Sequence, residues 1–369
     1  MVARLRQALR PCAHGFRHAG AHAQGVLLRA SESPDLTGPA TMTSPWLLCA
    51  DIGGTNLRLR AFDGHRDRAS EQHETGGPGD LAEIFGTFAA AQGTPPELVV
   101  AAVAGPVSDN RVNLTNASKS LCGEDLKRTT GAAEAWLIND FAAAAWATAR
   151  VAPADLLCLQ GAPAPHDEGL HVVVGPGTGL GVGTLVLRDG VATALPGEGG
   201  HVALAPNSRE EVAIFEAFRT LWPETFFGDG LTCEAEAMLS GTGLPLLYRA
   251  VQMVTGDTGP HLDARGVLTA AQEDSSPTAH RVAQIFKSHL ARMAGDLGIA
   301  LRADSVFLVG GVATKNPWLF DADFVEAFRQ GGRFTGLRSQ MNLYLLRNPD
   351  FGLMGAHNYA THRQSQRHG

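Results

Sequence analysis

The pattern of apolar and polar residues from Trp46 onward predicts alternating strands and helices. An apolar run over 46–50 is followed by a glycine turn and then by a stretch in which Leu57, Leu59 and Ala61 occupy every second position. A period of two is typical of a β-strand, so we predict two antiparallel strands joined by a tight turn. Further strands are expected over 98–103 and 135–138, and helices over 81–91 and from Phe141 onward.

The same order of elements then repeats in the second half of the chain. A valine-rich strand over 170–174 leads into a glycine-rich turn and a return strand over 184–187. Ser208 and Glu211 have the spacing of a capping box, which predicts the start of a helix. A long amphipathic helix is expected over 279–301 and a strand over 305–309.

The alternation of strands and helices predicts the α/β class. The unit strand, glycine turn, strand occurs twice, over 46–62 and over 170–187. Two copies of one unit that suits nucleotide phosphates predict two lobes with a cleft between them. The length of 369 residues also indicates about two domains.

Composition narrows the class of protein and its partners. Hydrophobic residues make up 44% of the chain and charged residues 18%, which favours a packed core over a charge-rich disordered chain. The net charge of −7 argues against nucleic acid as a partner. The five cysteines are scattered, which favours a reducing compartment and therefore the cytoplasm. Because no apolar run reaches the roughly 18 residues of a membrane span, we expect no membrane partner.

The N-terminal segment has a composition of its own. Residues 1–31 contain five arginines and no acidic residue. This bias resembles a transit peptide, but the segment is poor in serine. We therefore favour a disordered extension over 1–43, and the prolines and glycine over 32–45 predict a linker.

A first candidate phosphate site follows the first predicted strand. Phosphate oxygens need N–H donors, and a backbone approaches them closely only where a residue lacks a Cβ atom. A Gly-Gly pair alone is a hairpin signal, but the full string D-x-G-G-T-N-x-R, completed by Arg58, favours phosphate binding. An acid at the end of a strand, here Asp51, suits Mg²⁺, held directly or through water. The candidate residues are Asp51, Ile52, Gly53, Gly54, Thr55 and Asn56.

A second glycine string, G-P-G-T-G-L-G over 175–181, follows the valine-rich strand. It is not a Walker motif, because no Lys-Ser/Thr pair follows it. It is not a dinucleotide fingerprint either, because a strand and not a helix comes next. Its apolar flanks argue against a flexible surface loop. The candidate phosphate contacts are Gly177, Thr178 and Gly179. Gly310 and Gly311 follow a later strand and would let a flat base lie against the backbone or else begin a helix.

Two further strings carry polar groups that suit a substrate with hydroxyl groups. Asp140 comes directly after a strand, where it could accept a proton from a substrate hydroxyl or merely cap the helix that follows. In Gly197-Glu198-Gly-Gly-His201 the glycines hold an acid and a histidine in a tight loop, which suits paired hydroxyls. The alternative roles for His201 are those of a zinc ligand and of a histidine packed in the core.

Taken in order, D-x-G-G-T-N-x-R, I-N-D-F, G-x-G-T-G-L-G, L-P-G-E-G-G-H and L-x-G-G-V resemble the bacterial-type glucokinases over 46–357. These enzymes belong to the actin, sugar kinase and Hsp70 superfold. The resemblance implies a duplicated RNase H-like (actin-like ATPase) fold, with two lobes and an active-site cleft in which ATP, Mg²⁺ and a sugar meet. It also implies a small domain over 44–150, completed by 342–369, and a large domain over 151–341.

The resemblance also implies roles for individual residues. Asp140 would be the general base that deprotonates the sugar 6-hydroxyl, giving glucose 6-phosphate and ADP. The sugar hydroxyls would be bound by Asn116, Asn139, Glu198, His201 and Glu236. The sequence departs from the family after Asn116, where Ala117 stands in place of a frequent aromatic residue.

Several alternatives stay open at this level. The enzyme could phosphorylate another hexose, or use another phosphoryl donor such as polyphosphate. A non-catalytic sugar-sensing regulator on the same fold is a different class, but the segment 1–43 lacks the helical pattern of a DNA-binding appendage. The chain also lacks the C-x-C-G zinc motif of the repressor-and-kinase relatives, which favours the glucokinase branch. Assembly into a homodimer is likewise left open.

Overall fold

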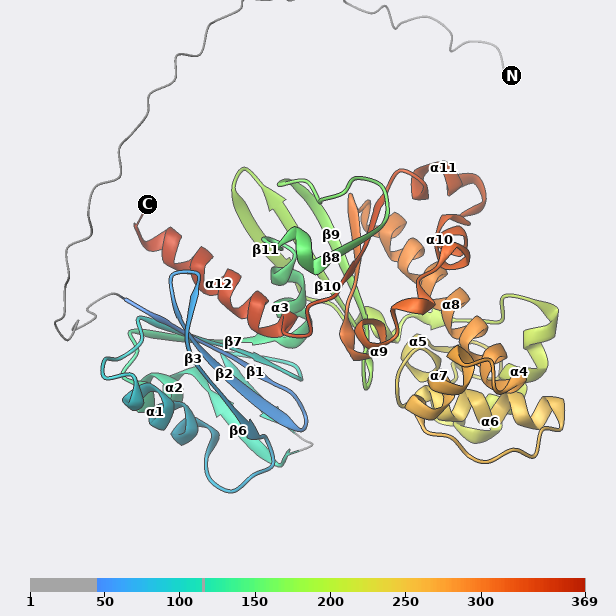
Figure 1. The fold of residues 1–369 in the computed structure, drawn as a ribbon, viewed down its shortest axis with the longest axis horizontal. Coiled ribbons are helices and arrows are strands. Elements are labelled where there is room, and N and C mark those ends of the chain that lie inside the picture. The colour runs from blue at the N-terminus through green and yellow to red at the C-terminus, as the bar shows by residue number, and fades with distance from the viewer. Residues whose placement is uncertain (1–44, 115–116, 369) are drawn as a thin grey trace, which may run out of the picture. The chain divides into compact units, whose positions relative to one another are not determined.

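Two mixed sheets with helices on their faces confirm the expected α/β class (Figure 1). The computed structural model describes residues 45–114 and 117–368, and all of them lie in one structural unit. The extension expected over 1–43 and the candidate residue Asn116 lie outside the described residues.

The first sheet has the strand order β3-β2-β1-β4-β7. Its strands are β1 (Leu47–Ile52), β2 (Asn56–Asp63), β3 (Arg66–Glu74), β4 (Leu98–Val103) and β7 (Glu134–Asn139). β2 runs antiparallel to β1 in the register Asp51 opposite Arg58, which confirms the predicted pair of strands. β3 is polar at almost every position, so no apolar alternation indicated it. A charged strand at the edge of a sheet also discourages pairing with another molecule.

The residues of β1 alternate between two apolar layers. Leu48 and Ile52 pack with α1 (Leu81–Ala91), which has the predicted bounds and is capped by the Asp80 carboxylate. Leu47 packs on the opposite face with α12 (Phe351–His368). The sheet therefore has helices on both faces, which is why β1 and β4 read as nearly continuous apolar runs.

The second sheet has the order β11-β10-β9-β14-β15-β8. Its strands are β8 (Leu156–Gln160), β9 (Gly169–Pro176), β10 (Leu180–Arg188), β11 (Val191–Leu195), β14 (Ser305–Leu308) and β15 (Asn342–Leu346). From β11 to β15 the strands repeat the directions of the first sheet: two antiparallel pairs and then two parallel pairs. The predicted second unit of strand, turn and strand is thus confirmed.

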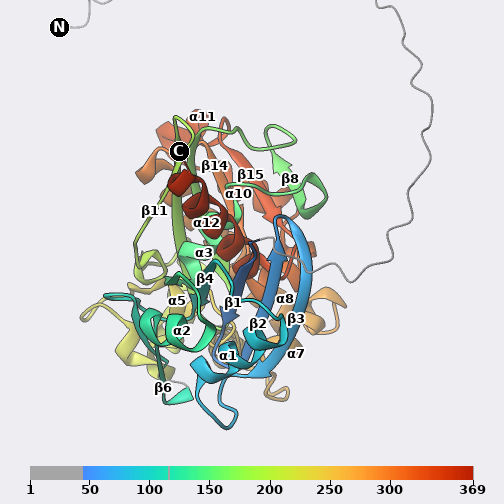
Figure 2. The same cartoon turned by 90° about the vertical axis from the view of Figure 1, so that its left-hand side faces the viewer.

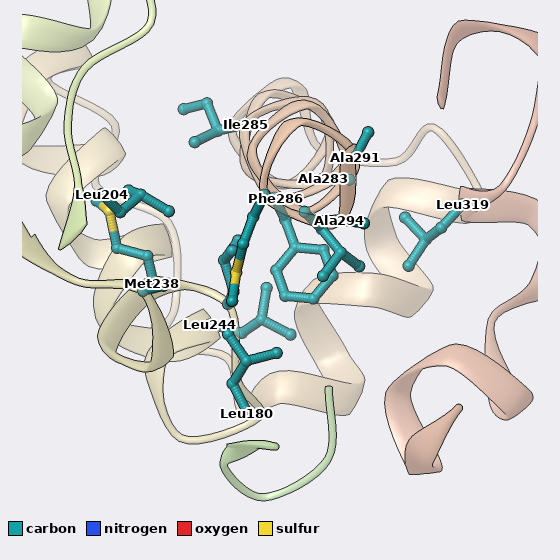
Figure 3. Packing of buried hydrophobic residues seen from close by; sticks show 14 of the residues in the cluster. Leu180, Leu204, Met238, Leu244, Ala283, Ile285, Phe286, Ala291, Ala294 and Leu319 are labelled. Carbon is teal, nitrogen blue, oxygen red and sulfur yellow. The ribbon is translucent and has the colours of Figure 1, made fainter. Parts of the chain in front are cut away.

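Helices cover both faces of the second sheet. Besides α1 and α12, the α-helices of the described chain are α2 (Gly123–Thr130), which packs beside α1 at the first sheet, α3 (Asp140–Ala147), α4 (Arg209–Leu221), α5 (Ala235–Met238), α6 (Gly243–Thr255), α7 (Ala264–Gln272), α8 (Pro277–Leu301), α9 (Gly310–Lys315), α10 (Ala322–Arg329) and α11 (Thr335–Arg338). One face packs around the long helix α8, whose Phe286 lies near Leu180 and Leu244 (Figure 3). The other face packs against α3 through Trp146 and Phe307.

Short elements complete the fold. Two two-stranded pairs are β5 (Arg111–Leu114) with β6 (Lys119–Cys122), and β12 (Ala203–Leu204) with β13 (Cys233–Glu234). Half of the predicted capping box is present at α4, where the Ser208 side chain accepts from the Glu211 N–H; the Glu211 carboxylate accepts at 2.7 Å from the N–H of Asn207, one residue before the cap, and not from that of Ser208. No helix in the described part of the chain is long and apolar enough to span a bilayer.

The C-terminal segment joins both sheets. β15 lies in the second sheet, whereas α12 packs on the first sheet and alongside α3 (Figure 2). A Cβ atom at Gly355 of α12 would overlap the backbone of Ala143 in α3. Glycine at this position therefore allows the two helices to approach closely.

Candidate active site

The first predicted phosphate turn is the link between β1 and β2. β1 ends at Ile52 and β2 begins at Asn56, so the turn itself is 53–55. The N–H of Gly53 donates to the carbonyl of Asn56 at 2.9 Å and closes it. Ile52 is fully buried, so only its backbone is available to a ligand, whereas Gly54 and Asn56 are exposed.

Side chains from β3 and the residue after it hold this turn in place. Thr75 is fully buried, and its hydroxyl donates to the carbonyl of Gly53 at 2.8 Å. The N–H of Thr75 donates to the carbonyl of Thr55 at 2.9 Å, and Gln72 donates to the side chain of Asn56 at 3.1 Å. The turn is therefore held by contacts within the fold that the sequence pattern did not indicate.

Asp51 lies between an arginine and the start of α12. Arg58 is 3.7 Å from the Asp51 carboxylate and 3.3 Å from that of Asp350, which also accepts from Arg60 at 2.7 Å. A Cβ atom at Gly352 would lie only 2.7 Å from the Asp51 Oδ1 atom, so this carboxylate lies against the first turn of α12. Burial raises the pKa of Asp51, Arg58 lowers it, and the charge of Asp350 raises it again.

The cap of helix α3 is Asn139 and not Asp140. The Asn139 side chain accepts from the N–H groups of Phe141 at 2.9 Å and Ala142 at 3.2 Å, and the helix begins at Asp140. The alternative in which Asp140 caps a helix that starts at Phe141 is therefore wrong, because the cap is Asn139 and the helix starts at Asp140. Because Asn139 caps the helix, the geometry of the helix start does not depend on a charge at Asp140.

The Asp140 carboxylate has the properties of a base near neutral pH. Its Oδ1 atom accepts from the Asn139 amide at 2.9 Å and from the Phe141 N–H at 3.0 Å. Burial raises the pKa of Asp140 to about 6, and the charge of Asp51 contributes to the increase. A carboxylate with this pKa is ionised at neutral pH and basic enough to accept a hydroxyl proton in a transition state.

The second predicted phosphate turn, 177–179, links β9 to β10. The N–H of Gly177 donates to the carbonyl of Gly179 at 2.8 Å. From the start of α6, the N–H of Thr242 donates to the carbonyl of Thr178 at 3.1 Å, and its hydroxyl donates to the same oxygen at 2.9 Å. This turn, like the first, is held from outside by residues distant in the sequence.

The glycines on either side of this turn have a packing role. Cβ atoms at Gly175 and Gly181 would overlap the ring of Phe141, and one at Gly183 would overlap its backbone. These glycines lie within β9 and β10 and allow the first turn of α3 to lie directly on the strands. Part of the glycine string is therefore explained by helix packing and not by phosphate binding.

Gly310 and Gly311 lie beside the second turn and begin α9. Gly310 has a φ of +90°, and a Cβ atom there would lie 2.6 Å from the carbonyl of Pro176. Only glycine suits this combination of positive φ and close backbone approach. Gly311 is exposed and has open space around its Cα atom. Both interpretations of this pair, a flat surface and a helix start, are compatible with the structure.

The loop with Glu198 and His201 is packed on the start of β10. Cβ atoms at Gly199 and Gly200 would collide with Val182 and with the Leu180 carbonyl, respectively. Glu198 and His201 are both exposed, which excludes the core-histidine alternative.

Two acids from the β13–α5 region approach this loop. Glu234 lies 3.1 Å from the Nδ1 atom of His201 and raises the pKa of that histidine, and Glu236 and Glu198 add to the effect. Glu236 also accepts from the N–H of Leu180 at 2.8 Å, and this hydrogen bond stabilises the end of the second predicted phosphate turn. The sequence indicated Glu236 through the family resemblance, whereas no local signal indicated Glu234.

The structure brings several of the predicted residues together in pairs. Asp51 and Asp140 interact electrostatically, and Asn139 and Glu198 line one pocket of about 570 Å³. Among the described residues no group of three or more His, Cys, Asp or Glu side chains is arranged to hold a metal. Mg²⁺ in kinases takes one or two carboxylates and completes its shell with phosphates and water. The Asp51 carboxylate, whose side chain is 25% exposed, fits this limited requirement.

Comparison with known proteins identifies the family. The glucokinase family model matches residues 48–363. A glucokinase of Nitrobacter hamburgensis is 34% identical over 314 residues, which are 84% of this chain and 95% of that protein. A glucokinase of Xanthomonas euvesicatoria is 33% identical over 342 residues, 89% of this chain and 99% of that protein.

Solved structures show the same fold. A glucokinase from an Antarctic psychrotroph superposes with a TM-score of 0.75 at 26% identity, covering 85% of this chain and 98% of that one. A ROK family glucokinase from Streptomyces griseus, in complex with glucose and AMPPNP, has a TM-score of 0.56 at 20% identity over 85% of this chain and 98% of that one. Both structures thus share the fold of this chain, and the family model and the curated relatives show that this chain belongs to the glucokinase family.

Proposed function

We propose that this protein transfers the γ-phosphoryl group of ATP to the 6-hydroxyl of glucose, forming glucose 6-phosphate and ADP. The observation that carries the proposal is Asp140, a half-buried carboxylate with a pKa raised to about 6 that interacts with Asp51 beside the first glycine turn. Membership of the glucokinase family supports glucose as the substrate. The AMPPNP bound to the Streptomyces griseus glucokinase supports ATP as the phosphoryl donor.

In this proposal the phosphates of ATP lie between the two turns, 53–55 and 177–179, with the base against Gly310 and Gly311. Bound Mg²⁺, held by Asp51 directly or through water, would neutralise charge on the phosphates. Asp140 accepts the proton of the 6-hydroxyl as the oxygen attacks the γ-phosphorus. Positioning and charge neutralisation supply most of the rate enhancement in phosphoryl transfer, because the protein forms no covalent intermediate.

Sugar recognition is assigned to Asn139, Glu198 and His201, with Asn116 and Glu236 as further candidates. Asn139 already uses its carbonyl oxygen as a helix cap and donates its amide to Gly105 at 3.1 Å and to Asp140. Its contribution would therefore be to position the base as much as to bind a hydroxyl. Glu236, which accepts from Leu180, would connect the sugar site to the second turn.

The reaction also requires a particular arrangement of the chain. We propose two lobes, 44–150 with the C-terminal segment and 151–341, that enclose ATP and sugar in a cleft and exclude water when they close. The packing of α12 on the first sheet supports the contribution of the C-terminal segment to the first lobe. We place the enzyme in the cytoplasm, in the first step of glycolysis, with a homodimer as the assembly to be tested.

A panel of hexoses measured by ADP release tests this function. Glucose should give the highest kcat/KM, with mannose and glucosamine as competitors, and ATP should be compared with polyphosphate as donor. Higher kcat/KM for another hexose would replace glucose as the substrate. Absence of ADP release with every sugar would refute a kinase and support the sugar-sensing regulator.

A further inference from the structure

A second pocket, of about 680 Å³, lies behind the loop that carries His201. Its walls come from residues 202–205, from one face of α8, and from the 330–338 segment after α10. It is larger than the pocket of about 570 Å³ at Asn139 and Glu198. The proposed kinase reaction uses none of its polar side chains.

Arg292 is the residue of this pocket that suits an anionic ligand. Its guanidinium donates to the side-chain oxygens of Asn207 at 3.3 Å and Gln330 at 3.1 Å. No carboxylate in the described part of the chain lies within ion-pairing distance of it. Its Nε atom is buried and has no hydrogen-bond partner among the described residues. The terminal N–H groups of Arg292 thus bind only neutral oxygens, and a carboxylate in the pocket would give this guanidinium its opposite charge.

Arg338 is the other arginine of the pocket lining. Arg338 lines the pocket with its side chain only 3% exposed, and its Nε atom also has no partner in the described structure. Asp296 neutralises its charge through an ion pair, and His289 on the same wall is held by Glu211 at 2.8 Å. Arg292 is therefore the one arginine on the described pocket lining that has no carboxylate paired with it.

The rest of the lining is apolar. Leu204, Met293 and Leu297 form part of the wall, and Leu204 is visible beside α8 in Figure 3. Phe334 is 53% exposed and Val202 38% exposed, and both lie at this pocket. Exposed apolar side chains around a concave surface are typical of a binding site.

We propose that this pocket binds a small organic monoanion, a carboxylate with an aromatic or branched apolar body. The planar guanidinium of Arg292 matches a carboxylate, and the apolar body would cover Leu204, Met293 and Phe334. A single unbalanced positive charge suits a carboxylate better than the double charge of a phosphate ester.

The pocket wall is continuous with the sugar-binding loop. Val202 follows His201 directly, and its carbonyl accepts from the N–H of Ala235 at 2.9 Å. Ala203 of β12 pairs with Glu234 of β13, the residue that hydrogen-bonds His201. A ligand that pushes or pulls β12 would therefore move both groups, and the pocket would act as an effector site. This coupling rests on the proposed role of His201 in sugar binding.

Calorimetric titration of the full chain tests the site with phenylacetate as the probe. Phenylethanol supplies the ring without the charge, acetate the charge without the ring, and phenyl phosphate the doubly charged alternative. Phenylacetate should bind at least about tenfold more tightly than any of the three, which corresponds to one good charge-assisted contact. Equal binding of phenylethanol, or tighter binding of phenyl phosphate, would overturn the assignment.

Variants locate the binding. Arg292→Gln should weaken phenylacetate binding by about tenfold or more, and Phe334→Ala, at an exposed position, should weaken it without affecting folding. Arg281→Gln is the matched control, because Arg281 lies on the same helix, pairs with Glu210 at 3.4 Å and is not part of the pocket. Unchanged binding in both Arg292→Gln and Phe334→Ala would refute the site.

Kinetics test the coupling separately. Saturating phenylacetate should change the KM for glucose in the unmodified enzyme and in Arg281→Gln, but not in Arg292→Gln. Binding with no change in KM would refute the coupling while the site stands. If the protein turned over no sugar at all, the titrations would still decide the site, so failure of the proposed function and failure of this inference are distinguishable.

Discussion

Replacing Asp140 by asparagine removes the proposed base while retaining the size of the side chain. Its Oδ1 atom accepts from the Asn139 amide and the Phe141 N–H, and an asparagine oxygen can accept the same two hydrogen bonds. The helix cap is unaffected, because Asn139 provides it. The variant therefore separates the charge of the carboxylate from its structural contacts.

The raised pKa of Asp140 determines the expected effect on stability. The folded pKa of about 6 exceeds the ordinary 3.8, so the unfolded state binds fewer protons between these values. The ionised carboxylate thus lowers the free energy of unfolding as pH rises through this window. The difference is worth about 3 kcal/mol at neutral pH, at about 1.4 kcal/mol per pKa unit. Asp140→Asn removes this cost, so the variant should be at least as stable as the parent at pH 7.

Activity should respond in the opposite direction. Loss of a general base typically costs about 10²–10⁴ in turnover, so ADP release from Asp140→Asn should fall by that factor with glucose and ATP saturating. In the parent enzyme kcat/KM should fall below a pH of about 6, as the carboxylate is protonated. The residual activity of the variant should lack this dependence.

Paired activity and calorimetric measurements on the purified variant decide the matter. Retained turnover together with a melting temperature lowered by several degrees would refute the reasoning, since Asp140 would then be structural. A parent enzyme whose activity is flat down to pH 4.5 would also contradict the assignment of the base.

Three further predictions follow from other contacts. Burial lowers the pKa of His171 to about 4, so the unfolded state binds more protons below pH 6.5, and the free energy of unfolding should fall by about 3 kcal/mol between pH 6.5 and 4. Denaturant titrations should show this slope reduced in His171→Leu. Gly352→Ala places a Cβ atom 2.7 Å from the Asp51 carboxylate and should lower kcat and raise the Mg²⁺ requirement in the coupled assay. Glu234→Gln removes the carboxylate that raises the pKa of His201, so His201 should titrate at a lower pH by NMR and the KM for glucose should increase.

Each of these predictions has a control and a contrary result. Gly336→Ala, at a helical glycine with no atom near the added Cβ, should leave activity unchanged, and equal losses in Gly336→Ala and Gly352→Ala would implicate helix effects in general. An unaltered pH slope in His171→Leu would assign the acid lability to other groups. An unmoved His201 titration in Glu234→Gln would show that their hydrogen bond is weak in solution.

Local patterns in the sequence were sufficient for the elements whose side chains alternate or recur regularly. The period of two in 57–62 predicted β2, and the apolar spacing over 81–91 predicted α1 with its observed bounds. The glycine turns were also visible, because a residue without a Cβ atom is needed wherever a backbone must be approached closely. Strand β3 was not, because an edge strand with polar side chains on nearly every position carries no periodic apolar signal.

The contacts that turn these elements into a site came only from the folded chain. Arg58 and Asp350 are 292 residues apart, and Glu234 reaches His201 across 33 residues, so no local period connects them. The sequence placed Asp140 at the end of a strand but could not choose between a base and a cap. Burial and the neighbouring Asp51 charge, which raise its pKa, and the Asn139 side chain, which caps α3, are consequences of packing between segments. Periodicity records which face of an element is buried, whereas charge, desolvation and orientation depend on what is packed against that face.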